Sequence, residues 1–128
     1  IDAVVSGSSG TIVAGNQISN AAKFNLNLSG GFVLAEIKDG TVDLNVDASY
    51  TSRTYFDIAQ TEAVSQKGYW VSNARLAYNG ERFSFGAGVK NIFNEKYFTY
   101  GLALRFAGLD YLIRGTPRTY SVDATIRF

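Results

Sequence analysis

The sequence contains no cysteine and no histidine, and it has a single proline. Without cysteine the chain can form no disulfide and carries no thiol nucleophile. Without histidine it lacks the commonest general base and a usual zinc ligand. These absences argue against an enzyme and against a metal centre, and we expect no cofactor.

Neither positive nor negative charge is concentrated in one segment of the chain. The formal net charge is +1, and the basic residues form no block, so we expect no nucleic-acid partner. No stretch approaches the ~20 consecutive apolar residues of a spanning helix. The chain opens with Ile1-Asp2-Ala3 and not with a basic and then hydrophobic signal segment, so an exported protein would need a further N-terminal part.

What the sequence does have is alternation of apolar and polar residues. The clearest case is residues 118–128, where the apolar positions are Tyr120, Val122, Ala124, Ile126 and Phe128. Successive side chains of a strand point to opposite faces, so a period of two predicts a β-strand with one apolar and one polar face.

Four further segments show this alternation: residues 23–32, which an apolar run extends to Ile37, residues 42–53, residues 70–78, where Val71 and Ser72 interrupt it, and residues 83–90. Asp39-Gly40 and Asn79-Gly80 are typical of the tight turns that join antiparallel strands. The 128 residues, 46% of them hydrophobic, therefore predict one ordered all-β domain, an antiparallel meander of about five to six long strands. The count depends on residues 102–106, which form either a separate strand or the extension of one.

The connections alternate between short turns, at Gly40 and Gly80, and long segments, at residues 54–67 and 94–117. Outer-membrane β-barrels show this alternation, with short periplasmic turns and long external loops. Residues 42–51 give ten alternating positions, near the ~9–11 needed to cross a bilayer and above the ~5–6 typical of strands in soluble proteins. Aromatic residues at the strand ends fit the girdles of such barrels: Tyr50, Trp70, Tyr78, Phe83, Tyr120 and Phe128.

The same alternation also fits a small soluble β-barrel that binds a hydrophobic ligand inside. The two interpretations differ in where the apolar side chains point. In a membrane barrel they face outward to lipid, whereas in a soluble barrel they converge on a core. The diagnostic positions are Leu44, Val46, Ala48 and Phe85.

Three runs of sequence resemble TonB-dependent outer-membrane receptors. Residues 89–97, VKNIFNEKY, resemble the KNLFDKKY-like segment of that family, and residues 115–120, GTPRTY, followed by a strand to Phe128, resemble its end. Residues 15–23, GNQISNAAK, are similar to the GNRLPNAPKH-like start of a late strand, with Ser19 and Ala22 replacing the two prolines. The resemblance implies that residues 1–128 are the C-terminal portion of such a receptor's large transmembrane β-barrel, without the plug domain and the earlier strands.

The resemblance further implies active uptake of a scarce nutrient, typically a ferric siderophore, across the bacterial outer membrane. Its partners would be outer-membrane lipid, the receptor's own plug domain and remaining barrel strands, the iron-chelate or other nutrient, and the TonB complex through an N-terminal region that lies outside this sequence. A passive, porin-like channel is the alternative within the same fold. Tyr120, Ile126 and Phe128 match the terminal signal for membrane insertion, although Asp123 stands where that signal usually has glycine.

Two groups of residues are candidates for function. Aromatic rings and guanidinium groups suit anionic or aromatic ligands such as iron chelates, which makes the long connection a candidate ligand site with Tyr97, Tyr100, Arg105, Tyr111 and Arg114. The alternative is that these rings pack on one another. Charged residues on the polar face are expected to pair across strands: Asp43, Asp47, Arg53, Arg75, Lys90, Asp123 and Arg127. Gly86 and Gly88 are expected to allow bending or the close approach of another backbone.

Overall fold

The computed structural model describes residues 4–7, 10–13, 15–104 and 107–127. Arg105 and Phe128, both expected to be functional, lie outside these residues. Apart from one 3₁₀ turn, η1 (Glu62–Val64), all regular structure in the described part is β. No helix among the described residues is long and apolar enough to span a membrane.

The chain divides into two compact units. The first, which we call the sheet unit, comprises Leu26–Tyr50, Trp70–Glu95 and Thr116–Phe128. The second, the loop unit, comprises Ile1–Asn25, Thr51–Tyr69 and Lys96–Gly115.

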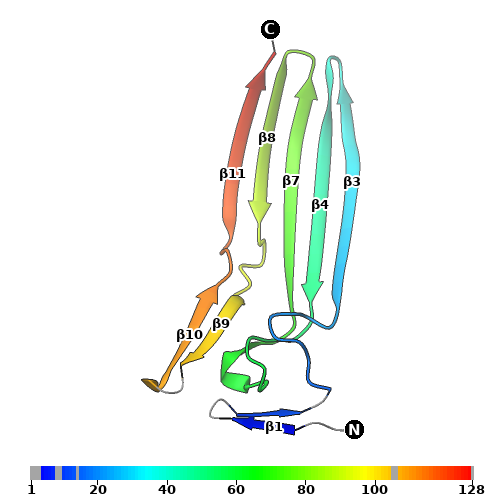
Figure 1. Cartoon of the computed structure of the whole chain (residues 1–128). Coiled ribbons are helices and arrows are strands. Elements are labelled where there is room, and N and C mark those ends of the chain that lie inside the picture. The colour runs from blue at the N-terminus through cyan, green and yellow to red at the C-terminus, as the bar shows by residue number, and fades with distance from the viewer. Residues whose placement is uncertain (1–3, 8–9, 14, 105–106, 128) are drawn as a thin grey trace. The chain divides into compact units, whose positions relative to one another are not determined.

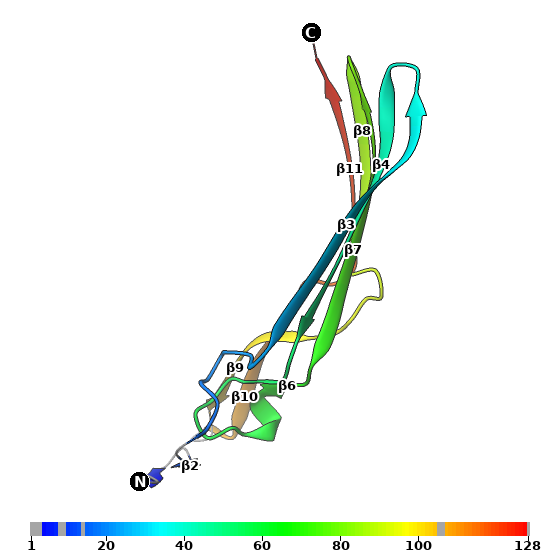
Figure 2. The ribbon, with the colours of Figure 1, turned by 90° about the vertical axis from the view of Figure 1, so that its right-hand side faces the viewer.

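The sheet unit is built on a five-stranded sheet in the order β11-β8-β7-β4-β3. Its neighbouring strands run in opposite directions (Figure 1). The strands are β3 (Asn25–Ile37), β4 (Gly40–Thr51), β7 (Tyr69–Gly80), β8 (Phe83–Lys90) and β11 (Thr119–Ile126). Strands that follow one another in this list are neighbours in the sheet, so the predicted antiparallel meander is confirmed. The sheet twists along its length (Figure 2), as antiparallel sheets do.

Strand register places the apolar residues in rows. Ala87 of β8 lies between Leu76 of β7 and Val122 of β11. Phe85 likewise pairs with Tyr78 and with Ala124. Residues directly opposite each other in a sheet share a face, so one face of these three strands is apolar, as the alternation predicts.

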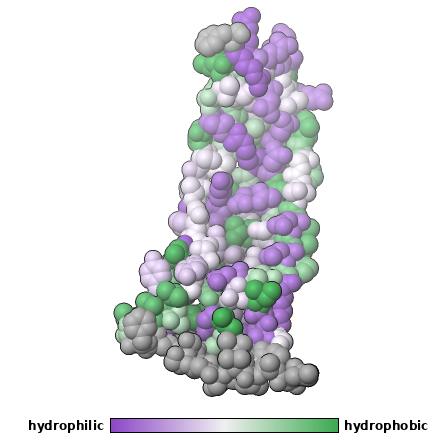
Figure 3. Space-filling view, viewed as in Figure 1, coloured by the Kyte–Doolittle hydropathy of each residue, from purple (hydrophilic) through white to green (hydrophobic). Residues whose placement is uncertain are grey.

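That apolar face is open and not covered by a core. The exposed fraction is 84% for Val122, 55% for Phe85 and 36% for Val46, and Leu44 and Ala48 are only half-buried. The buried hydrophobic residues of the described part are Phe56, Val64 and Ala77. The diagnostic side chains therefore do not converge, which contradicts the soluble barrel with an apolar interior. A band of polar residues follows the strands on the face of the sheet in Figure 3.

The short turns at one end of the sheet contact each other. The Glu81 N–H donates a hydrogen bond to the Asp39 carbonyl oxygen at 3.1 Å, and the Arg127 N–H donates to the Arg82 carbonyl oxygen at 2.9 Å. A Cβ on Gly40 would overlap the backbone of Asn79 and Gly80. Backbone cannot yield as a flexible side chain can, so the close approach of the two turns requires glycine at position 40.

The loop unit contains three short hairpins. Strand β1 (Val4–Gly7) pairs with β2 (Gly10–Val13), β5 (Thr54–Tyr55) with β6 (Ser65–Gln66), and β9 (Phe98–Leu104) with β10 (Leu109–Arg114). The latter two show that residues 54–67 and 94–117, which were expected to be long connections, contain short paired strands of their own. Residues 102–104 belong to β9, a strand paired in its own two-stranded sheet.

A small core holds the loop unit together. Val64 is fully buried and Phe56 is 7% exposed, and the Phe56 N–H donates a hydrogen bond to the Val64 carbonyl oxygen at 3.0 Å. The Phe56 ring lies against Gly101 of β9, where an added Cβ would come within 2.6 Å of it. The Phe98 N–H donates to Oε1 of buried Gln66 at 2.9 Å. The two inner hairpins are thereby joined.

Candidate functional site

The first motif run is organised around one buried asparagine. Asn91 is 2% exposed, and its Nδ2 donates hydrogen bonds to the carbonyl oxygens of Glu95, at 2.9 Å, and Thr116, at 3.0 Å. Its Oδ1 accepts from the Glu95 N–H at 2.8 Å. With φ at 51°, the residue has a left-handed backbone, which asparagine tolerates better than most residues.

A second asparagine adds to this arrangement. The Asn94 N–H donates to the Asn91 carbonyl oxygen at 2.8 Å, and Asn94 Oδ1 accepts a hydrogen bond from the Arg118 N–H at 3.1 Å. The Arg118 guanidinium donates to the Ile92 carbonyl oxygen at 3.4 Å. The two runs VKNIFNEKY and GTPRTY are therefore joined, and we call this the asparagine joint (Asn91, Asn94, Glu95, Thr116, Arg118).

The asparagine joint brings together the two ends of residues 96–115, which we call the insert. Tyr97, at the start of the insert, stacks on Tyr69 with ring centroids 4.4 Å apart. The Gly115 N–H donates to the Tyr97 carbonyl oxygen at 2.8 Å, and a Cβ on Gly115 would overlap the Tyr97 ring. Tyr97 is thus packed in place against a ring that lies outside the insert.

The other described candidate residues lie on the β9–β10 hairpin. Tyr100 pairs with Ile113, and Tyr111 pairs with Leu102, so both tyrosines lie on one face, where they are 40% and 55% exposed. A register shift after Ile113 aligns Arg114 with Phe98, which is two residues from Tyr100 and therefore on the same face. The structure brings these three residues together, and their contact with a ligand stays a prediction.

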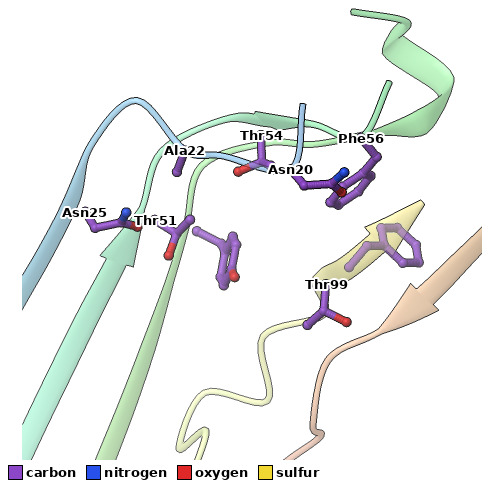
Figure 4. Close-up of a pocket in the computed structure, with 9 residues that line it drawn as sticks. Asn20, Ala22, Asn25, Thr51, Thr54, Phe56 and Thr99 are labelled. Atoms are coloured by element: carbon purple, nitrogen blue, oxygen red, sulfur yellow. The ribbon is translucent and has the colours of Figure 1, made fainter. Parts of the chain in front are cut away.

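Sequence reasoning missed a pocket of about 260 Å³ in the loop unit. Its lining comes from separate segments of the chain (Figure 4), which share no motif. The residues that line the pocket are Asn20, Ala22, Asn25, Thr51, Thr54, Phe56, Tyr69, Phe98 and Thr99. Hydroxyl groups, carboxamides and aromatic rings are present, and no charged side chain lines the pocket.

Hydrogen bonds fix the segments around this pocket. The Ser52 N–H donates to the Phe24 carbonyl oxygen, and the Phe24 N–H donates back to Ser52 Oγ, both at 3.0 Å. The Asn20 N–H donates to the Tyr55 carbonyl oxygen at 2.7 Å. Thr54 is 8% exposed, and its hydroxyl donates to the Ser52 carbonyl oxygen at 3.3 Å. The pocket walls are therefore tied to one another through the backbone.

Arg53, which was expected to pair across strands, pairs within the loop unit. Its Nη1 lies 2.5 Å from Oε1 of Glu62 and 3.4 Å from the Tyr55 hydroxyl. The hydrogen bond to Tyr55, followed by the interaction with Glu62, raises the pKa of Arg53 above its ordinary value. The Arg53 guanidinium therefore already has two partners within the loop unit.

Two of the charges that were expected to pair across strands, Arg75 and Asp123, do so. Arg75 on β7 makes a two-pronged ion pair with Asp123 on β11, at 2.5 and 2.8 Å, and thus spans β8. The carboxamides of Asn79 and Asn73 each donate at 2.6 Å, to Asp43 and Asp47 respectively. No group of three or more His, Cys, Asp or Glu residues in the described part is placed to hold a metal ion.

The Arg75–Asp123 pair explains the glycines of β8. A Cβ on Gly86 would overlap the Arg75 guanidinium, and one on Gly88 would come within 2.9 Å of Ser121 Oγ. The lack of a side chain at Gly86 leaves room for the Arg75 side chain, which crosses β8. This corrects the expectation that another backbone approaches there. Asp123, in place of the usual glycine, has a partner.

Removing either charge should loosen the hold on the terminal strand. We expect Arg75→Ala or Asp123→Ala in the whole receptor to lower the temperature at which the folded barrel is lost, because each leaves the other charge unpaired. The measurement is gel migration of unheated against heated receptor. The charge-swapped pair Arg75→Asp with Asp123→Arg should recover much of the loss, and Thr125→Ala on the same strand is the control. Single variants that behave like wild type would rule out this role.

Long two-faced strands, apolar side chains on an open face, polar pairs on the other and short turns at one end define the wall of an outer-membrane β-barrel. The family profile described as TonB dependent receptor-like, beta-barrel, matches residues 1–92. The chain belongs to this family. Its members are transport receptors of the Gram-negative outer membrane and not enzymes, and this chain is an outer-membrane protein.

Two solved structures share the fold. The ferric yersiniabactin uptake receptor FyuA of Yersinia pestis matches with a TM-score of 0.80 and 19% identity, over 93% of this chain and 19% of that one. The ferric-catecholate import receptor Fiu of E. coli K12 matches with a TM-score of 0.68 and 19% identity, over 93% of this chain and 17% of that one. The chain thus spans about a fifth of the length of these receptors. None of the curated proteins matches it significantly.

Proposed function

We propose that residues 1–128 are the C-terminal portion of the barrel of a receptor that takes up a scarce nutrient, typically a ferric siderophore, with energy supplied through TonB. The observation that carries the proposal is the open apolar face of a sheet whose strands match a TonB-dependent receptor barrel. The two structural neighbours are named for the uptake of ferric chelates, which supports an iron-chelate as the nutrient.

This assignment requires parts that lie outside these residues. The plug domain would fill the barrel, the remaining strands would close it, and an N-terminal region would contact the TonB complex. Outer-membrane lipid would cover the apolar face. Tyr120 and Ile126, 71% and 57% exposed on that face, together with Phe128, are proposed to form the signal read during membrane insertion.

The function is tested in a bacterium that lacks the receptor gene. Under iron limitation, we expect growth on ferric siderophores to require both the reintroduced receptor and an intact TonB system. Uptake that continues without TonB would instead indicate the passive channel. Uptake that depends on neither would refute the proposal.

Substitution of the arginines in the insert tests the ligand site. We expect Arg114→Ala or Arg105→Ala in the whole receptor to weaken binding of a ferric siderophore roughly tenfold or more, because a hydrogen bond to a charged group contributes about 1.5–3 kcal/mol. The dissociation constant is measured by titration in detergent. Arg82→Ala, in a short turn of the sheet unit, is the matched control. Unchanged affinity in both variants would show that neither arginine of the insert contributes to ligand binding.

A further inference from the structure

The pocket of the loop unit is polar but uncharged, which restricts what it can bind. We propose that it binds a neutral ring that carries several hydroxyl groups, namely a sugar ring. The inference rests on the proposed uptake function and refines it, because the sugar would be the nutrient itself or a group attached to an iron chelate.

The polar groups of the pocket suit hydroxyl groups. Asn20 and Asn25 are exposed, and their side-chain carboxamides have no hydrogen-bond partner among the described residues. Each carboxamide offers both donors and an acceptor, so it can bind two neighbouring hydroxyl groups of a sugar at once. The hydroxyl groups of Thr51 and Thr99 lie on the same lining. Thr51 is hydrogen-bonded to the Tyr69 side chain, and the Thr99 hydroxyl donates to the Ile113 carbonyl oxygen at 3.4 Å, so each keeps only part of its hydrogen-bonding capacity for a ligand.

Aromatic rings supply the apolar part of the pocket. Phe56 and Phe98 line it, and Tyr69 adds a half-buried ring. A sugar ring has a face of C–H groups that gains free energy when an aromatic surface removes it from water. A lining with apolar rings and a few convergent polar groups is typical of small-molecule sites.

The size of the pocket selects a single ring. Pockets for drug-sized ligands are roughly 300–1,000 Å³, whereas this one is about 260 Å³. It is therefore too small for a whole ferric siderophore and suits one ring of such a ligand or one unit of a saccharide.

Charge argues against the anionic part of a chelate. A buried anion needs a cation or several donors, and none of the lining residues is charged. Arg53 of the same unit is held by Glu62 and Tyr55. An anionic group would therefore bind elsewhere on the receptor, for example at Arg114.

The strand positions favour a solute over a lipid. Asn25 of β3 is in phase with Asn27, and Thr51 of β4 is in phase with Ser49. Alternate residues of a strand share a face, so both pocket residues belong to the polar series of their strands. That series lines the water-filled side of a barrel.

The experiment uses the whole receptor in detergent, with saturation-transfer NMR and titration. The probes are glucose, galactose, N-acetylglucosamine and maltose, and a ferric catecholate with and without attached glucose. We expect a sugar-bearing probe to bind, and Asn25→Leu and Phe98→Ala each to weaken it at least tenfold. Asn27→Leu, in phase on the same strand and outside the pocket, is the matched control, and migration of the unheated protein shows that each variant is folded.

The probes distinguish the sources of the sugar. Binding of a free saccharide, weakened by Asn25→Leu, supports the nutrient itself, whereas binding of the glucosylated chelate alone supports an attached sugar. Absence of binding by every sugar-bearing probe, or binding that the pocket variants leave unchanged, overturns the inference. TonB-dependent growth on ferric siderophores is measured in parallel, so the proposed function can stand when the sugar site fails.

Discussion

Replacing Asn91 by alanine is expected to open the base of the insert. The variant loses three side-chain hydrogen bonds and leaves the Glu95 N–H and the carbonyl oxygens of Glu95 and Thr116 without that partner. Alanine also has to adopt a φ near 51°, at roughly 1–2 kcal/mol. With a net contribution of about 1 kcal/mol for each hydrogen bond, we expect a local loss of about 3–5 kcal/mol.

Hydrogen exchange in the whole receptor measures this loss where it occurs. We expect the Glu95 amide to exchange about 10²–10⁴ times faster in Asn91→Ala, because local opening sets the exchange rate and each 1.4 kcal/mol is about tenfold. Asn91→Gly separates the two causes, since glycine accepts the positive φ and still loses the bonds. Asn45→Ala, an exposed residue of β4, is the control. An exchange rate unchanged within tenfold would show that the asparagine joint does not depend on Asn91.

The isolated chain of residues 1–128 is expected to aggregate in water. Its sheet has two edge strands, β3 and β11, whose unpaired backbone groups are templates for further strands. Its open face carries large apolar side chains such as Phe32, 55% exposed, and Leu76, 46% exposed. In lipid each unpaired backbone group would cost several kcal/mol, so neither medium suits the chain alone.

Light scattering and sedimentation of the refolded chain test this expectation. We expect large, polydisperse particles in buffer, and recovery of folded material only when the other barrel strands are supplied with lipid or detergent. A monodisperse monomer that unfolds cooperatively in water would contradict both this prediction and the outward direction of the apolar face.

The sheet could be predicted from the sequence because its strands are two-faced. Residues 42–51 and 83–90 alternate almost without interruption, and a one-residue slip would invert every side chain. The pattern therefore determined the strands and the faces together. Asp39-Gly40 and Asn79-Gly80 marked the sites of the short turns to within two residues, but the turn residues are Lys38-Asp39 and Glu81-Arg82. Neither Gly40 nor Gly80 has a positive φ, so the turns do not have the geometry that these pairs predicted.

The loop unit could not be predicted in the same way. Strand β9 has apolar residues on both faces, with Phe98 and Leu102 on one and Ala103 on the other, so the period of two is hidden. The pocket draws on segments as distant as Asn20 and Thr99, and no local spacing reveals such a meeting. Among the candidate ligand residues, the sequence supplied the chemistry of Tyr97, but its stacking depends on contacts outside its own segment.

The contacts of Gly86 were hidden for a related reason. A glycine in a strand signals that something approaches closely, but not what it is. Here it is the guanidinium of Arg75, which crosses β8 to reach Asp123 on the next strand. Only the register of three strands brings these residues together.

The asparagine joint bonds mainly to backbone atoms, namely the carbonyl oxygens of Glu95 and Thr116 and the amides of Glu95 and Arg118. These hydrogen bonds therefore do not depend on which side chains occupy the insert, residues 96–115. Substitutions or length changes within residues 96–115 would leave these hydrogen bonds intact, and strands β8 and β11 on either side would keep their register.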